Sequence, residues 1–99
     1  MDKKILLNKI VLITGGAQGI GSFIAKRFLE EGASVVIADI DEAKFNRNFK
    51  NIDGDLLFIQ ADLTLSEDID KVYTSVYSKF KKLNILINNA AILDATSYN

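Results

Sequence analysis

The stretch that decides the fold is the glycine-rich segment Thr14-Gly15-Gly16-Ala17-Gln18-Gly19-Ile20-Gly21. It follows directly on the apolar run at residues 10–13, which is rich in Ile and Val as buried strands are. It leads into residues 19–31, where apolar residues recur with a period of about 3.6. The order of these three pieces predicts a strand, a tight turn and a helix.

The three spaced glycines of this segment have separate uses. Gly15 permits a sharp exit from the strand, and Gly19 lets the backbone approach a pyrophosphate at a helix N-terminus, where free N–H groups favour anions. Gly21 has no Cβ, so the helix can pack closely against the strand. Ser22 stands where an ATP- or GTP-binding P-loop has lysine, and the spacing fits a methyltransferase loop poorly. The segment therefore predicts a dinucleotide-binding turn.

Three more apolar runs, at residues 35–38, 56–59 and 85–87, are continuous rather than alternating. Strands covered on both faces of a parallel sheet have this pattern. Helical periodicity returns between them, strongly over residues 66–81 and weakly over residues 41–50. The order β-α-β-α-β-α-β predicts an α/β fold with a doubly wound parallel sheet.

The helices carry further local signals. The first is expected to bury an apolar stripe and to expose Ser22; the stripe comprises Ile20, Phe23, Ile24, Phe28 and Leu29. Gly32 is expected to stop it. Thr64 and Glu67 have the spacing of a capping box at the start of the third helix.

Each predicted strand is followed by a polar residue, and the four are Thr14, Asp39, Asp62 and Asn88. In a parallel sheet these residues lie along the carboxyl edge. Open α/β sheets bind ligands outside that edge, where the strand order reverses. The sequence therefore predicts the binding site there.

Two motifs give the chain a family resemblance. The pattern Thr14-Gly15-x-x-x-Gly19-x-Gly21 looks like the fingerprint of the short-chain dehydrogenase/reductases, and Asn88-Asn89-Ala90-Ala91 resembles their Asn-Asn-Ala-Gly. The resemblance extends over residues 9–91, with one departure at Ala91. It implies the N-terminal, cofactor-binding portion of such an enzyme, with a Rossmann-type sheet of strand order 3-2-1-4 that stops before the catalytic half. Residues 1–99 are then one NAD(P)-binding unit.

The resemblance also implies which residues bind the cofactor. The pyrophosphate and its surroundings would be held by Gly15, Gln18, Gly19, Ile20 and Gly21. Asp62 and Leu63 would line the adenine pocket, and Asn89 and Ala90 would pass along the ribose nearer the nicotinamide. The plainer alternatives are helix initiation for Asp62 and strand termination for Asn88 and Asn89.

Asp39 indicates which nicotinamide cofactor is bound. It lies 18 residues after Gly21, where a carboxylate can accept hydrogen bonds from the adenosine ribose. The same charge would repel the 2′-phosphate of NADP. No basic residue follows at residues 40–42, where Asp41 is expected to cap the next helix, and position 18 is Gln. NAD is therefore predicted over NADP.

No catalytic residue is predicted within the chain. The family carries a Ser and a Tyr-x-x-x-Lys well after its Asn-Asn-Ala-Gly element. The match at Tyr77 and Lys81 precedes that element, on a helix expected to cover the sheet's face, so it is interpreted as structural. Ser97 and Tyr98 follow Ala91 too closely. The 99 residues alone are thus expected to lack turnover, although full-length relatives transfer hydride between NAD(P) and a carbonyl or alcohol.

Two alternatives to a piece of an enzyme remain open at this point. One is a natural NAD-binding module without catalysis, acting as a sensor or partner subunit. The other is a degenerate truncated reading frame, which would leave the fourth strand as an uncovered apolar edge.

The amino-acid composition excludes several kinds of catalytic and binding site. The 99 residues include no His, Cys, Trp or Pro, which excludes disulfides, thiolate nucleophiles and His-based triads, and no metal site is predicted. With 12 basic and 13 acidic residues, nothing favours nucleic acid or an anionic membrane. The N-terminal apolar run is too short for a signal peptide, so a cytoplasmic protein is expected. Substrate and oligomeric state stay open.

Overall fold

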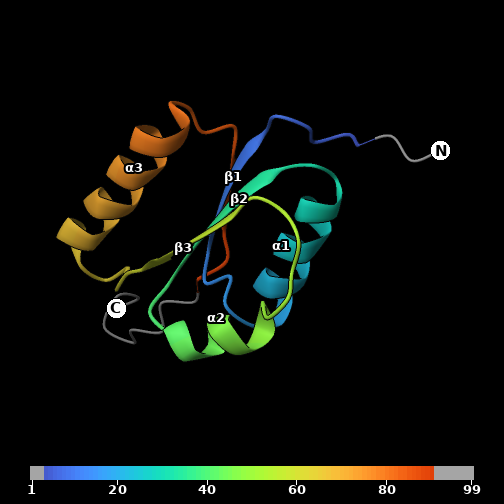
Figure 1. Cartoon of the computed structure of the whole chain (residues 1–99). Coiled ribbons are helices and arrows are strands. Elements are labelled where there is room, and N and C mark those ends of the chain that lie inside the picture. Colours follow the sequence, from blue (N-terminus) through green and yellow to red (C-terminus); the bar gives the residue numbers. More distant parts are fainter. Residues whose placement is uncertain (1–3, 91–99) are drawn as a thin grey trace.

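The computed structural model describes residues 4–90, which form one parallel sheet with helices on both faces. Its strands are β1 (Ile10–Thr14), β2 (Ser34–Asp39), β3 (Leu56–Gln60) and β4 (Ile85–Asn88). The helices between them are α1 (Gly19–Glu30), α2 (Glu42–Asn48) and α3 (Ser66–Phe80). In Figure 1, α3 lies on one face of the sheet and α1 and α2 lie on the other. The strand order is β3-β2-β1-β4, which confirms the predicted doubly wound topology.

The register of the sheet aligns the ends of the strands. Thr14, the last residue of β1, pairs with Ala38 of β2 and with Asn88 of β4. Asp39 at the end of β2 pairs with Gln60 of β3. The carboxyl edge therefore carries Thr14, Asp39 and Asn88, as predicted. Asp62 is the exception, because β3 ends at Gln60 and Asp62 lies two residues further on.

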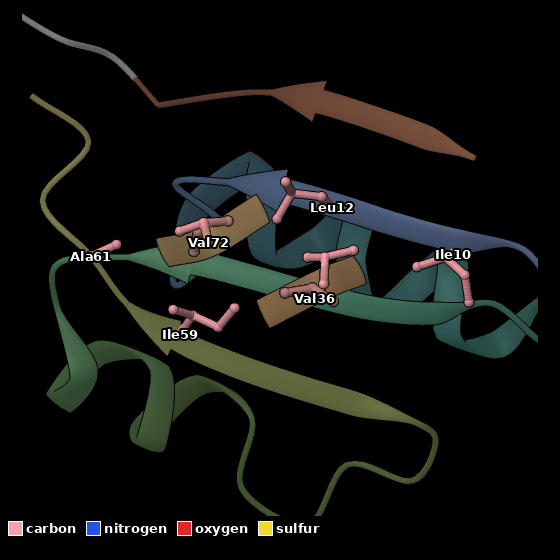
Figure 2. Close-up of a cluster of buried hydrophobic side chains, with 8 residues drawn as sticks. Ile10, Leu12, Val36, Ile59, Ala61 and Val72 are labelled. Carbon is pink, nitrogen blue, oxygen red and sulfur yellow. The ribbon is translucent and has the colours of Figure 1, made fainter. Parts of the chain in front are cut away.

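The core under α3 is built from alternate residues of three strands. Figure 2 shows side chains of β1, β2 and β3 in one cluster with Val72 of α3, and the labelled strand residues are Ile10, Leu12, Val36 and Ile59. Each aliphatic side chain so buried stabilises the fold by about 1.5–3 kcal/mol relative to an exposed one. Intervening strand residues point to the opposite face and are buried too, which explains the continuous apolar runs.

The second core lies under α1 and α2. Ala25 and Leu29 of α1 pack on the sheet together with Phe49, which follows α2. The ring of Phe45 stacks on Phe49 with centroids 4.9 Å apart and on Phe58 of β3 at 4.4 Å. These ring contacts fix α2 against the sheet, although its sequence pattern was the weakest of the three helices.

The predicted buried face of α1 is partly wrong. Ile20 and Phe23 are about 70% exposed, at 71% and 70%, whereas Ser22 is buried. The side that packs inward is lined by Gly21, Ser22, Ala25 and Leu29. Small residues at the first turn let the helix approach closely, which rotates the larger side chains away. The Ser22 hydroxyl is satisfied locally, because it donates to the Gly19 carbonyl at 2.9 Å.

The start of α3 also differs from its sequence pattern. The residue before the first helical turn is Leu65, and no side chain caps the helix, so the Thr64–Glu67 capping box is wrong. Thr64 instead donates its hydroxyl to Asp62. The Thr64 hydroxyl is therefore bound within the turn that precedes α3 and does not cap the helix.

The remaining local predictions hold. Asp41 caps α2 by accepting from the Lys44 amide at 3.0 Å. Gly32 follows α1 with φ +93°, the left-handed conformation of a helix stop. β4 is an edge strand of the described sheet, and Leu86 is 48% exposed there. Within residues 4–90, the helices are too short and too polar to cross a membrane.

Candidate functional site

Thr14, the last residue of β1, links this strand to the end of β4, at the place where the strand order reverses. Its hydroxyl oxygen accepts from the backbone amides of Asn89 at 3.1 Å and Ala90 at 3.3 Å, and the hydroxyl donates to Asn88 Oδ1 at 2.8 Å. One side chain thus fixes the direction in which the chain leaves β4. The segment after β4 is held beside the glycine-rich loop.

Gly15 makes that close approach possible. Its φ is +70°, and a Cβ built on it would lie 2.9 Å from Ala90 Cα. Asn89 Nδ2 donates to the Gly15 carbonyl at 3.1 Å. The loop after β1 and the segment after β4 therefore form one packed unit, which brings Gly15, Asn89 and Ala90 together.

Gly21 is needed for a contact that its motif did not specify. A Cβ there would lie 2.6 Å from Asn89 Nδ2 and 2.6 Å from the Gly15 carbonyl oxygen. The first turn of α1 thus packs on the loop and on the segment after β4. The sequence predicts close packing of α1 on the strand, and the contact with the loop adds a second requirement for glycine at this position.

The N-terminus of α1 is exposed, and no acidic side chain of its first turn occupies it. Gly19 has φ +59°, and a Cβ on it would meet nothing within 4 Å. Gln18, Gly19 and Ile20 are all exposed. No side chain caps this helix, and its first turn contains no acidic residue. The first backbone N–H groups and the helix dipole are therefore available to an anionic ligand such as a phosphate.

Asp39 connects β2 with this loop. Its Oδ2 accepts from the Ala17 amide at 3.0 Å, and its Oδ1 accepts from the Asp41 amide at 2.9 Å. A carboxylate has about four acceptor positions, so capacity remains for a diol. Asp39 can therefore hold the loop and bind ribose hydroxyls with the same group.

Asp62 and Leu63 lie beyond β3, further along the edge. Asp62 Oδ1 accepts from the Thr64 amide at 3.0 Å and from the Thr64 hydroxyl at 2.6 Å. The bond from the Thr64 hydroxyl, and after it the bond from the Thr64 amide, lowers the pKa of the Asp62 carboxyl below its ordinary 3.8. Partial desolvation of the carboxylate acts in the opposite direction. Leu63 contributes to a largely apolar hollow of about 180 Å³ that also touches Thr14 and Ala90.

The titration of Asp62 should depend on Thr64. Because the folded pKa is depressed, this carboxylate stabilises the fold above the ordinary pKa of about 4, and the contribution is lost as pH falls through the folded value. We expect carboxyl carbon NMR to give Asp62 a midpoint below 3.8. Thr64→Ala should raise that midpoint and Thr64→Ser should not. A midpoint unmoved by Thr64→Ala would contradict the assignment.

The Tyr-x-x-x-Lys match lies far from this site. Tyr77 is in the last turn of α3 and is 49% exposed, and Lys81 caps that end of the helix with φ +66°. The chain continues from there to Asn84, whose amide donates to Ile10 at the amino end of β1. Tyr77 and Lys81 thus lie near the sheet edge opposite the glycine loop. Ala91, Ser97 and Tyr98 lie outside the described residues.

Sequence reasoning missed two residues of the site. Ala17 is fully buried between β2 and α2, and Asn48 Nδ2 donates to its carbonyl at 2.9 Å. The Ala17 amide is the one bound by Asp39. No local signal distinguishes Asn48 from Asn46, two residues earlier on the same helix. Only the path of the loop does so.

The comparisons with known proteins bear directly on this geometry. The model of the short chain dehydrogenase family matches residues 9–99. The chain belongs to that family. A short chain dehydrogenase/reductase of Gibberella zeae, dpfgG, is 44% identical over 91 residues, covering 90% of this chain and 34% of its own. The galactitol 2-dehydrogenase of Agrobacterium fabrum is 43% identical, with coverages of 95% and 37%.

Solved structures agree with this assignment. The 3-ketoacyl-(acyl-carrier-protein) reductase of Brucella melitensis, complexed with NADH, matches with a TM-score of 0.76 and 41% identity. The match covers 82% of this chain and 33% of that one. The short chain dehydrogenase family consists of NAD(P)-dependent oxidoreductases and binds a nicotinamide dinucleotide. This chain spans about a third of the length of the curated relatives it matches, at 34% and 37%.

Proposed function

We propose that this chain binds NAD, in preference to NADP, as the cofactor-binding part of a short chain dehydrogenase. The observation that carries the proposal is the uncapped N-terminus of α1 beside Asp39. The open helix start suits a pyrophosphate, and the carboxylate of Asp39 suits the adenosine ribose. NADP would place its 2′-phosphate against this carboxylate, and the described residues next to it add no basic side chain at positions 40–42.

The residues that would hold the cofactor divide into three groups. Gly15, Gln18, Gly19, Ile20 and Gly21 would surround the pyrophosphate, Asp62 and Leu63 the adenine, and Asn89 and Ala90 the ribose nearer the nicotinamide. Thr14 binds the amide of Asn89 and Asp39 binds the amide of Ala17 in the glycine-rich loop, which supports the first and third of these roles. Leu63 lines a hollow together with Thr14 and Ala90, which supports the second. The cofactor supplies hydride transfer; the residues proposed here bind and orient it.

For the 99 residues by themselves we propose cofactor binding without turnover, with residues 1–99 as one NAD(P)-binding Rossmann unit. Tyr77 and Lys81 lie at the end of α3, near the sheet edge opposite the glycine-rich loop, and this position supports the proposal. The whole protein would reduce a carbonyl or oxidise an alcohol. The cytoplasmic location stays a prediction.

Cofactor preference can be tested with the unmodified chain. Two like charges about 4 Å apart repel each other by about 1 kcal/mol in water and by about 4 kcal/mol near a protein surface. We therefore expect NADH to bind at least about fivefold more tightly than NADPH. Titration followed by nicotinamide fluorescence would measure both dissociation constants. Equal affinities, or tighter binding of NADPH, would exclude the preference; no binding of either would exclude the function.

A further inference from the structure

We propose that Asn48, the last residue of α2, is a positioning residue for the dinucleotide. Its side-chain amide donates to the Ala17 carbonyl across 31 residues of sequence and so holds the phosphate-binding loop. The inference rests on the proposed function, because it concerns the loop at the same site. It adds a residue outside every motif of the sequence, on α2 rather than on the helix that the glycine-rich loop leads into.

Ala17 is held on both sides by side chains from the β2–α2 unit. Its amide donates to Asp39 at the end of β2, at 3.0 Å, and its carbonyl accepts from Asn48 at the end of α2, at 2.9 Å. Ala17 is fully buried, at 0% exposure. A buried backbone carbonyl needs a hydrogen-bond partner, and Asn48 supplies it here. The two bonds together fix the position of the peptide groups on either side of Ala17.

This fixed residue directly precedes the ligand-facing backbone. Gln18 is the residue before the first turn of α1, and Gly19 has φ +59° with open space around it. A loop that is already ordered binds without an ordering cost, whereas a loop that samples other conformations binds in proportion to its competent fraction. Anchoring Ala17 therefore raises affinity without any contact between Asn48 and the ligand.

The anchor is itself firmly placed. Phe45 and Phe49, on either side of Asn48, stack on each other, and Phe45 also stacks on Phe58 of β3. Lys26 of α1 lies over the Phe49 ring, with its Nζ 5.3 Å from the centroid. These contacts fix α2 to the sheet and to α1, so Asn48 holds the loop relative to the core.

The test compares two asparagines on one helix. Asn46 lies on the exposed side of α2, so Asn46→Ala and Asn46→Asp control for helix propensity and for added charge. We expect Asn48→Ala to weaken NADH binding about three- to tenfold, the range expected from one lost hydrogen bond. Asn48→Asp should weaken it further, because an isosteric carboxylate faces the Ala17 carbonyl. Both Asn46 variants should bind within about twofold of the unmodified chain.

A second measurement needs no ligand. Amide exchange at Ala17, followed by NMR, should be faster in Asn48→Ala than in Asn46→Ala. Unchanged exchange together with unchanged NADH affinity would overturn the proposal, and so would a fall in melting temperature with affinity intact, since a merely structural role predicts that pattern. If the unmodified chain fails to bind NADH, the proposed function and the ligand named here both fail. The exchange data would then decide separately whether Asn48 anchors the loop.

Discussion

Gly21→Ala is expected to weaken NADH binding by at least about fivefold. The added methyl would lie 2.6 Å from the Gly15 carbonyl oxygen, which is backbone, and 2.6 Å from Asn89 Nδ2. The first turn of α1 must therefore move away from the loop and from the segment after β4. Overpacking of this kind costs about 1–3 kcal/mol, which is about a five- to 150-fold change in an equilibrium constant if it falls on the binding-competent state.

The control for Gly21→Ala is Gly32→Ala, at the glycine between the end of α1 and β2. Gly32 has φ +93° and lies at the opposite end of α1, so Gly32→Ala should destabilise the fold by about 1–2 kcal/mol through backbone strain. Its NADH affinity should stay unchanged. Isothermal titration and thermal melting of both variants separate lost affinity from lost stability. Binding by Gly21→Ala at the unmodified affinity would refute the steric account.

The second large effect is expected from Asp39→Ala. This substitution removes the acceptor for the amides of Ala17 and Asp41 as well as the proposed ribose contact. A hydrogen bond to a charged group contributes about 1.5–3 kcal/mol, so the loss of one such bond to the ribose should lower NADH affinity by about 10- to 150-fold. NADPH affinity should fall less, because the repulsion of its 2′-phosphate disappears. The preference for NADH should therefore shrink.

Asp39→Asn separates charge from hydrogen bonding. The amide keeps one acceptor oxygen, so its loss of NADH affinity should be smaller than that of alanine, while the preference for NADH shrinks equally. Asp53→Ala, in the turn before β3, removes the same charge far from the loop and should change neither. Nicotinamide fluorescence titrations of the three variants give all the dissociation constants. An Asp39→Ala chain with undiminished NADH affinity would remove Asp39 from the site.

The local sequence pattern was a good guide to the elements and to the edge that carries the site. Continuous apolar runs predict parallel strands because both faces of such a sheet are covered. The residues that end β1, β2 and β4 then lie along one edge by the geometry of the fold. α1 was harder: its largest apolar residues, Ile20 and Phe23, point away from the described sheet. Hydrophobic periodicity weighs side-chain size, whereas close packing here selects Gly21, Ser22 and Ala25.

The sequence by itself determined the strand–loop–helix unit, the parallel sheet and the family, because these follow from short-range spacing and from residue types that suit few conformations. Only the tertiary structure decided the partners of the loop. Gly21 packs against Asn89, Thr14 binds the amides after β4, and Asn48 rather than Asn46 reaches Ala17. Those contacts join residues 31 to 76 positions apart. Their geometry depends on how closely helices approach the sheet, which no local pattern encodes.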